Sequence, residues 1–304
     1  MERELAGTHC GPVNQDRFVD SWQGQYLAAH LISDVGKKRE KNEDACVVCA
    51  PENIKLLLSR GVLFAVADGM GGASAGEHAS HLALKVLVES YFEGNRPQTK
   101  VPIALRTALE MANVRIYEEA SMSPELSGMG TTVSAMAILG NWAYIAQVGD
   151  SRIYHFRKGD GLQQITQDHS LVEEQVRCGV LTPDEARNHS LKKLITRAVG
   201  IRKSVDIDLF VNEIRNGDVI FICSDGMSNM VTDEQIEDLI LNESLDVALQ
   251  HMMNYALAAG GTDNITAVAV EVTDTPPKVT LQQSIEIPLL QPNGLIRKIL
   301  GFFR

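Results

Sequence analysis

The hydrophobic residues of this chain occur in short apolar runs of the length typical of β-strands. Runs of this kind lie at 26–33, 45–50, 61–67, 131–138, 141–148, 151–156, 206–212, 218–224 and 265–272. Gly140 and Asn141 lie between two of these runs and are typical of the turn in a β-hairpin. The pattern therefore predicts a protein rich in strands.

Longer stretches of helical period separate the clusters of strands. Residues 75–92 and 102–119 each place their apolar side chains along one helical face. Two further helices are predicted after Asp225, near 232–242 and 245–259. Clustered strands and paired helices favour an α+β fold, in which two sheets pack face to face with helices outside, over a strict βαβ alternation.

The character of the chain changes at three points. Residues 1–25 are polar without clear periodicity and are expected to form an irregular leader, and the main domain spans 26–272. The polar stretch at about 167–203 is expected to be a partly helical flap over the core. Residues 273–304 are expected to be a linker, indicated by its prolines, followed by a basic amphipathic segment.

Composition and charge narrow the classes of function. The chain has 304 residues with a formal net charge of -11. An acidic surface repels the phosphate backbone, so nucleic-acid binding is not expected. No apolar run reaches signal-peptide length or the roughly 18 residues of a membrane span, which predicts a cytoplasmic protein.

The cysteines are odd in number and scattered, which argues against a disulfide framework. They are Cys10, Cys46, Cys49, Cys178 and Cys223. Cys46 and Cys49 form a C-x-x-C pattern, which in other settings indicates zinc or redox chemistry. Here both belong to a predicted strand, where residues three apart point to opposite faces. Two buried thiols are therefore the favoured interpretation.

Two buried strands end in the same dipeptide, at Asp68-Gly69 and at Asp225-Gly226. An aspartate at the end of an apolar strand is costly unless it is paired or bound to a metal. The glycine lets the backbone approach a ligand closely. A single Asp-Gly would be read as an ordinary turn, because this dipeptide is common in turns.

Further acidic residues lie at other predicted strand ends. They are Glu43 and Asp44 before the strand at 45–50, Asp150 between two strands, and Asp263 before the last strand. Carboxylates that converge on one rim repel one another unless cations lie among them. Ligands that are all oxygen select hard ions such as Mg²⁺ or Mn²⁺, whereas zinc would favour His and Cys at close spacing.

Arg39 lies just before the first acidic pair. Its guanidinium can bind a phosphate in a bidentate manner, which a lysine cannot do. A solvated basic turn explains the same residue equally well, because Lys37, Lys38 and Lys41 surround it.

Taken in order, these motifs resemble the protein phosphatase 2C family, the PPM-type metal-dependent serine/threonine phosphatases, and its bacterial members in particular. The motifs are Gly36-x-x-Arg39-x-x-Asn42-Glu43-Asp44, Asp68-Gly69-Met70-Gly71-Gly72, Gly130-Thr131-Thr132, Val148-Gly149-Asp150-Ser151-Arg152, Ser224-Asp225-Gly226 and Asp263-Asn264. Each is short, but together and in family order they are specific. The flap region also resembles that of the family, from Thr166 to Gly200.

The resemblance implies a four-layer αββα sandwich with a metal cleft at one end. It implies that Asp68 bridges two Mn²⁺ or Mg²⁺ ions, with Gly69 offering its carbonyl oxygen. Asp225 and Asp263 would hold the first ion, and Glu43 with Asp44 would support the second. A third ion would lie between Asp150 and Asp225, and Arg39 would bind the substrate phosphate.

The implied mechanism is attack on phosphorus by a hydroxide that bridges two metal ions. Animal relatives carry a histidine directly after Asp-Gly, whereas this chain has Met70, as bacterial members commonly do. A thioether cannot donate a proton to the leaving alkoxide, so a water on the metal is the first candidate acid. His169 in the flap is a second candidate, although a structural or solvent-facing histidine is favoured there.

The resemblance also implies partners: proteins that carry phosphoserine or phosphothreonine, and a serine/threonine kinase whose action is reversed. The segment 294–304 is suited to a membrane surface or a partner groove, but folding back on an apolar patch of its own domain is slightly favoured. Two other functions stay open. One is a catalytically silent regulator, which should have lost metal ligands, and the other is a phosphohydrolase of small metabolites.

Overall fold

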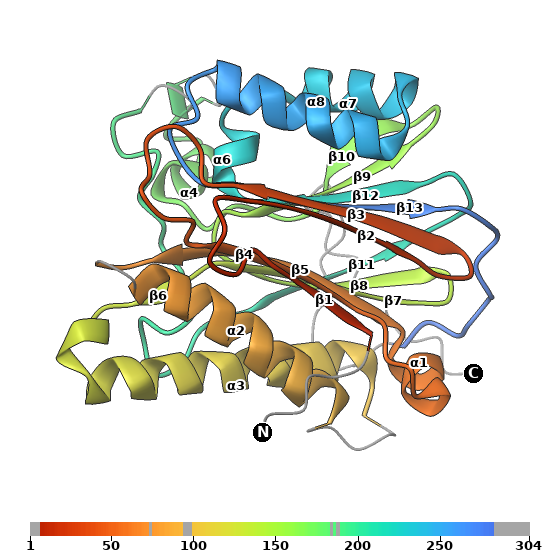
Figure 1. Ribbon diagram of the computed structural model, residues 1–304, viewed down its shortest axis with the longest axis horizontal. Helices are drawn as coiled ribbons and strands as arrows, with labels where there is room; N and C mark the ends of the chain where they lie inside the picture. Colours follow the sequence, from red (N-terminus) through yellow and green to blue (C-terminus); the bar gives the residue numbers. More distant parts are fainter. Residues whose placement is uncertain (1–6, 73–74, 94–98, 183–184, 187–188, 283–304) are drawn as a thin grey trace.

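The computed structural model describes residues 7–72, 75–93, 99–182, 185–186 and 189–282. Figure 1 shows four stacked layers: a pair of helices, two sheets packed face to face, and a second pair of helices. The α+β class and the four-layer αββα sandwich expected from the sequence are therefore confirmed.

The first sheet has seven strands, and its neighbours pair antiparallel. Their order is β1 (Thr8–Gly11), β4 (Asp44–Cys49), β5 (Val62–Met70), β7 (Val133–Leu139), β8 (Trp142–Val148) and β11 (Asp208–Glu213), with β6 (Gly130–Thr131) paired to β5. The predicted hairpin joins β7 to β8. Gly140 lies at its turn with a positive φ of 58°, a conformation that glycine adopts without strain.

The second sheet has six strands, and it is also antiparallel. Their order is β10 (Gly161–Gln164), β9 (Arg152–Arg157), β12 (Val219–Cys223), β13 (Ile265–Val272), β3 (Leu27–Asp34) and β2 (Arg17–Gln23). In this sheet β3, near the start of the chain, pairs with β13, near the end of the described residues. Residues far apart in the sequence are thereby brought to a common edge.

Buried apolar side chains fill the space between the sheets, among them Phe64, Phe210 and Ile222. Cys46 belongs to this core, whereas Cys49 on the same strand belongs to the core under α2 and α3. Both thiols are buried and free. The interpretation as two buried cysteines on opposite faces of a strand is confirmed.

The outer helices pack on the sheets through the apolar faces that the sequence predicted. α2 (Ala75–Phe92) and α3 (Val101–Met122) cover the first sheet, and α7 (Asp233–Asn242) and α8 (Leu245–Ala258) cover the second. α7 begins with a capping box, in which the Thr232 and Gln235 side chains each bond the other's backbone. The shorter helices are α1 (Ile54–Arg60), α4 (Leu171–Arg177) in the flap, α6 (Asp225–Ser228) and the 3₁₀ turn Pro124–Leu126.

The irregular structure expected for residues 1–25 is wrong for the part that the structure describes. This part contains β1 and β2, which add an edge strand to each sheet. The alternation of β2 is weak in the sequence, because Asp20 lies on its inward face and Val19 on its exposed face. The division of the chain into a leader, a main domain and a linker otherwise stays a prediction.

The prolines after β13 lead into an ordered segment, residues 276–282, which we call the C-terminal strap. Val279 accepts a hydrogen bond from the Trp142 ring N–H at 3.1 Å and donates its N–H to Asn141 at 3.0 Å. Gln282 bonds the Tyr144 hydroxyl at 2.9 Å and accepts the backbone N–H of Val101 at 2.9 Å. The strap therefore ties the β7–β8 turn to the start of α3.

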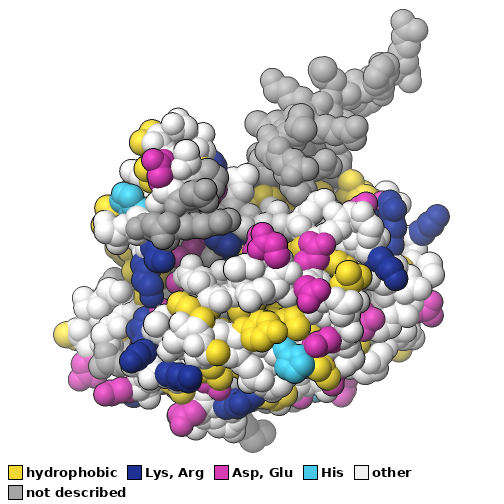
Figure 2. All heavy atoms as spheres, turned by 90° about the horizontal axis from the view of Figure 1, so that it is seen from above, with side chains coloured by type: hydrophobic (Ala, Val, Ile, Leu, Met, Phe, Trp, Pro, Cys, Tyr) yellow, Lys and Arg dark blue, Asp and Glu magenta, His cyan; other side chains and the backbone are white. Residues whose placement is uncertain are grey.

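The outer face of α7 and α8 is seen from above in Figure 2. Acidic and basic side chains are both scattered over it, with hydrophobic side chains between them. Within the part of the chain that the structure describes, no helix is long and apolar enough to cross a membrane. The C-terminal segment 294–304 lies outside the described residues.

Candidate metal centre

The acidic residues predicted from the sequence lie at the end of the sandwich that is farthest from the strap. Asp44 begins β4 and is paired in register with Asp68 near the end of β5. Asp150 follows β8, Asp225 follows β12, and Asp263 precedes β13. Both sheets thus contribute carboxylates to one rim, which lies at the left in Figure 1.

Asp44 is the most deeply enclosed of these groups, with 0% of its surface exposed. One carboxylate oxygen, Oδ2, accepts the Ser224 hydroxyl at 2.7 Å. The other, Oδ1, is buried without a hydrogen-bond partner. Burial raises the pKa of Asp44 to about 7, although hydrogen bonds from Ser224 and Thr266 act to lower it. A buried carboxylate oxygen without a donor is suited to bind a cation or the water on a cation.

Asp68 is surrounded by carboxylates, and its backbone is held by the Gly-Thr-Thr motif. Burial, together with the charges of Asp44 and Asp225, raises its pKa well above the ordinary value. The Asp68 N–H donates to the Thr132 hydroxyl at 3.0 Å, and the Asp68 carbonyl accepts the Thr131 hydroxyl at 2.9 Å. The strand end is therefore fixed in place while its carboxylate stays directed at the rim.

Gly69 fits a space that no side chain could occupy. A Cβ on Gly69 would lie 2.1 Å from the Gly76 carbonyl oxygen at the start of α2 and 2.6 Å from the Glu43 carbonyl oxygen. The Gly69 N–H donates to that Glu43 oxygen at 3.1 Å. Close backbone approach at this position thus brings the loop before β4, the end of β5 and the start of α2 together.

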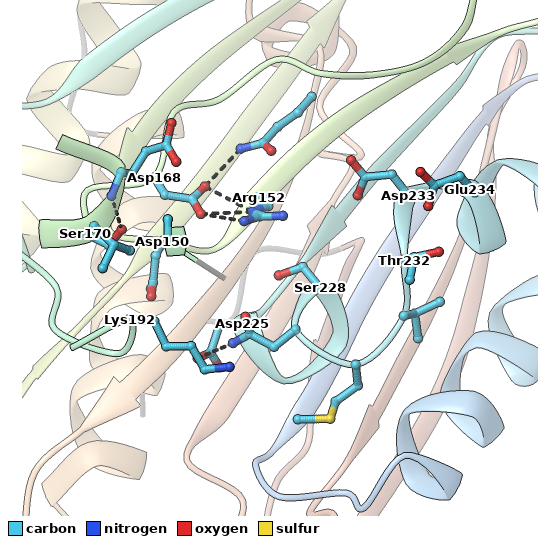
Figure 3. Close-up of a pocket in the computed structure, with 17 residues that line it drawn as sticks. Asp150, Arg152, Asp168, Ser170, Lys192, Asp225, Ser228, Thr232, Asp233 and Glu234 are labelled. Carbon is cyan, nitrogen blue, oxygen red and sulfur yellow. Dashed lines mark hydrogen bonds and ion pairs between the residues drawn. The ribbon is translucent and has the colours of Figure 1, made fainter. Parts of the chain in front are cut away.

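Asp150 and Asp225 line one cavity of about 450 Å³ between the flap and the turn that follows α6. Figure 3 shows Asp168 paired with Arg152 beside them, and Lys192 between Asp150 and Asp225. Burial, followed by the charge of Asp225, raises the pKa of Asp150 to about 8. Burial and the charge of Asp263 raise the pKa of Asp225. Like charges are thus gathered where only a cation would balance them.

Two basic side chains contact Asp263. Arg39 donates to one oxygen at 2.8 Å, and Lys193 of the flap donates to the other at 3.0 Å. Arg39 also lies 4.0 Å from Glu43. The side chain of Arg39 is 47% exposed, so its guanidinium lies where the rim opens to solvent.

Asn264 has a role that the sequence did not reveal. Its amide donates to the carbonyl oxygens of Val35 and Lys41 at 2.9 Å each and accepts the N–H of Glu43 at 2.9 Å. It therefore braces the loop that carries Arg39. The sequence signals for it were its position directly after Asp263 and its place in the Asp263-Asn264 motif.

Among the described residues, no three carboxylate, histidine or cysteine side chains converge closely enough to enclose a cation as they stand. The contacts explain this spacing. Asp263 is held by Arg39 and Lys193, and Asp225 accepts a hydrogen bond from the Asn229 amide at 3.1 Å. The donor set nevertheless fits Mn²⁺ or Mg²⁺, because it is all oxygen, is gathered at one rim and includes the unpartnered oxygen of Asp44.

His169 is fully buried, with 0% exposure, which supports the structural role over that of a proton donor. Its ring nitrogens contact the Gly149 N–H at 3.1 Å and the Asp208 carboxylate at 3.1 Å. Both nitrogens are therefore engaged within the protein.

Comparison with known proteins agrees with this geometry. The profile of the family described as "Protein phosphatase 2C" matches residues 37–265. The serine/threonine phosphatase Stp of Listeria welshimeri is 36% identical over 252 residues, which are 81% of this chain and 96% of that protein. The crystal structure of the Mycobacterium tuberculosis phosphatase PstP/Ppp has a TM-score of 0.72 at 34% identity, and covers 82% of this chain and 99% of its own. The structure of the PstP catalytic domain in complex with two manganese ions has a TM-score of 0.70 at 35% identity. The match covers 82% of this chain and 99% of that chain.

Proposed function

This chain belongs to the protein phosphatase 2C family and is a metal-dependent serine/threonine protein phosphatase, and we propose that the acidic rim shared by its two sheets is the metal centre. The observation that carries this proposal is the gathering of Asp44, Asp68, Asp150, Asp225 and Asp263 at one end of the sandwich. Burial raises the pKa values of four of them, so their negative charges are destabilised without a cation.

We assign the ligands as follows. Asp68 would be shared by two ions, and the Gly69 carbonyl would offer a further oxygen. Asp225 and Asp263 would hold the first ion, and Glu43 with Asp44 would support the second. Asp150 and Asp225 would hold a third. When bound, the ions supply positive charge that activates water and stabilises charge on the phosphoryl oxygens.

The remaining steps depend on the chain's own side chains. We propose that Arg39 binds the phosphate of the substrate, because its guanidinium lies at the solvent-facing edge of the rim next to Asp263. Thr131 and Thr132 hold the backbone of Asp68. Asn264 braces the loop of Arg39 through the Val35 and Lys41 carbonyls.

The substrates are phosphoproteins, as expected for this class of enzyme. We further propose that a serine/threonine kinase in the same cell is the enzyme that it opposes. We propose a cytoplasmic location, which is consistent with the five free cysteines of the chain. Docking through 294–304 stays a prediction.

The test is release of phosphate from a phosphothreonine peptide with Mn²⁺, with EDTA, and by the Asp225→Asn variant. Asparagine keeps the size of the side chain but removes the charge, so we expect at least about a 100-fold loss of kcat/KM, on the scale of several kcal/mol that a bound ion contributes. Asp160→Asn is the matched control, because Asp160 is 63% exposed in the β9–β10 turn. Full activity of Asp225→Asn, or of the wild type in EDTA, would refute the assignment. An inactive, well-folded wild type would favour a silent regulator.

A further inference from the structure

His169 joins the flap to the turn that carries Asp150. Its backbone N–H donates to the Gly149 carbonyl at 3.0 Å, and its ring nitrogen Nδ1 accepts the Gly149 N–H at 3.1 Å. Gly149 has a φ of 106°, and on its other side a Cβ would lie 2.5 Å from Thr132. The turn is therefore clamped between Thr132 and His169, with Asp150 as its next residue.

The opposite edge of the ring fixes the ring's orientation. Because Nδ1 accepts a hydrogen bond, the ring proton lies on Nε2, which donates to Asp208 Oδ2 at 3.1 Å. Asp208 in turn accepts Arg197 at 2.8 Å through Oδ1. Asp208 begins β11 and pairs with Gln147 of β8, so the ring is supported from the sheet as well as from the flap.

The flap is attached to the same residue. The carbonyl of His169 accepts the N–H of Thr196 at 2.7 Å. The next residue, Ser170, caps α4 by accepting the Glu173 N–H at 3.3 Å and forms a β-bridge with Ile195. The segments in which the chain enters and leaves the flap, near Ser170 and Thr196, therefore meet at His169, next to the turn that carries Asp150.

We propose that His169 is a positioning residue that couples the base of the flap to the cation position of Asp150. This inference rests on the proposed function, because it assumes that Asp150 holds a cation. Loss of the Nδ1 acceptor leaves the buried Gly149 N–H without a hydrogen-bond partner, which is unfavourable. The turn relieves that cost by moving, and Asp150 moves with it.

The test uses two substitutions that each keep one half of the ring's function. His169→Asn retains an acceptor at the position of Nδ1 but loses the contact with Asp208. His169→Gln retains a donor at the position of Nε2 but loses the acceptor for Gly149. Asp150→Asn serves as the reference, since it identifies the class of Mn²⁺ sites that depends on Asp150.

The readout is Mn²⁺ binding to the full chain, measured by titration calorimetry and by electron paramagnetic resonance of free Mn²⁺. We expect His169→Gln to weaken the Asp150-dependent class by about fivefold or more, the equivalent of losing one such hydrogen bond. We expect His169→Asn to weaken Mn²⁺ binding at the same class of sites by less than about threefold. Equal effects of the two variants, or wild-type binding by His169→Gln, would overturn the proposal.

A second readout tests the coupling to the flap. Trypsin can cut the flap after Lys192, Lys193 and Arg197. We expect saturating Mn²⁺ to slow this cleavage in the wild type and to have little effect in His169→Gln. An equal slowing in both proteins would contradict the coupling.

Two further results separate the causes of failure. If His169→Gln does not fold, Asp208→Ala replaces it, because removal of Asp208 lets the ring turn away from Gly149. Unchanged Mn²⁺ binding by folded Asp208→Ala would then overturn the proposal. If Asp150→Asn itself binds Mn²⁺ like the wild type, the assigned cation position and this inference both fall. If only the His169 variants bind like the wild type, the inference alone falls.

Discussion

Two kinds of buried aspartate occur in this protein, and their partners give them opposite acidities. The rim aspartates face one another, so burial and repulsion raise the pKa of Asp44 to about 7 and that of Asp150 to about 8. Burial acts in the same direction on Asp218, but hydrogen bonds from Arg157 and the nearby ring of His155, whose Nε2 lies 3.0 Å from the carboxylate, lower its pKa to about 2. The first kind is suited to bind cations, and the second is a structural clamp.

Arg39 is the residue whose substitution should affect substrate binding most directly. We expect Arg39→Ala to raise KM for a phosphothreonine peptide by about tenfold or more, because a charge-assisted bidentate contact is worth about 1.5–3 kcal/mol. The KM of Arg39→Lys should lie between those of the wild type and Arg39→Ala, because lysine keeps the positive charge but cannot make a bidentate contact. Steady-state kinetics give the values.

Arg106→Lys is the control for this series. Arg106 lies on the surface of α3, and Glu110 is its ion-pair partner among the described residues. An unchanged KM in Arg39→Ala would show that the phosphate is bound elsewhere, and the guanidinium of Arg39 would then serve Asp263 alone.

Asp218 predicts a defined dependence of stability on pH. Its folded pKa lies below the ordinary 3.8, so its stabilisation is present above pH 3.8 and is lost as the pH falls toward 2. We expect Asp218→Asn to lower the free energy of unfolding by about 2 kcal/mol at pH 7 and by about half as much near pH 3. Urea unfolding in EDTA at the two pH values measures this difference. A gap between the two proteins that does not change with pH would rule out the ion pair as its source.

At the scale of secondary-structure elements, the strap is the part whose role is least visible in the sequence. Its prolines are typical of a linker, yet Val279 and Leu281 pack on the core under α3 and two backbone N–H groups are bonded to side chains of the β7–β8 hairpin. A segment with such contacts contributes to the stability of the sheet it crosses.

Two truncations separate the strap from the tail that follows. Ending the chain after Thr275 removes the contacts with Trp142 and Tyr144, and we expect a loss of about 2–4 kcal/mol from the hydrogen bonds and the apolar contacts together. Ending it after Gln282 keeps those contacts and should melt like the full chain. Thermal unfolding in EDTA compares the three proteins. Equal midpoints for the two truncations would show that the strap does not stabilise the domain.

At the scale of the whole molecule, the acidic rim and the net charge of -11 both oppose the folded state. Divalent cations that bind only the folded protein should relieve this opposition. We expect saturating Mn²⁺ to raise the free energy of unfolding by about 3 kcal/mol at one hundred times the dissociation constant, and EDTA to reverse it.

The Asp225→Asn variant provides the control for this effect. Its apo form should be at least as stable as the apo wild type, because one buried charge has been removed from the rim. Saturating Mn²⁺ should raise the free energy of unfolding of this variant by less than it raises that of the wild type. Calorimetry at matched ionic strength compares the four states. An equal gain in the two proteins would mean that Mn²⁺ binds away from Asp225.

The sequence alone was sufficient for the layers of the fold and for the residues of the rim. Apolar runs and helical periods are local signals, and each records the burial of one face of one element. The carboxylates were found because each follows or precedes a buried strand, as Asp68 and Asp225 do. Their order along the chain was enough for the family resemblance.

The tertiary structure alone decided which distant residues support that rim. Asn264 braces Val35 and Lys41, His169 clamps Gly149, and residues 276–282 cross the β7–β8 hairpin. The edge strands β1 and β2 also became visible only when paired. The contacts of Asn264, His169 and the strap share one physical reason. Such contacts join residues far apart in the chain through single hydrogen bonds, and these leave no periodic pattern in the sequence.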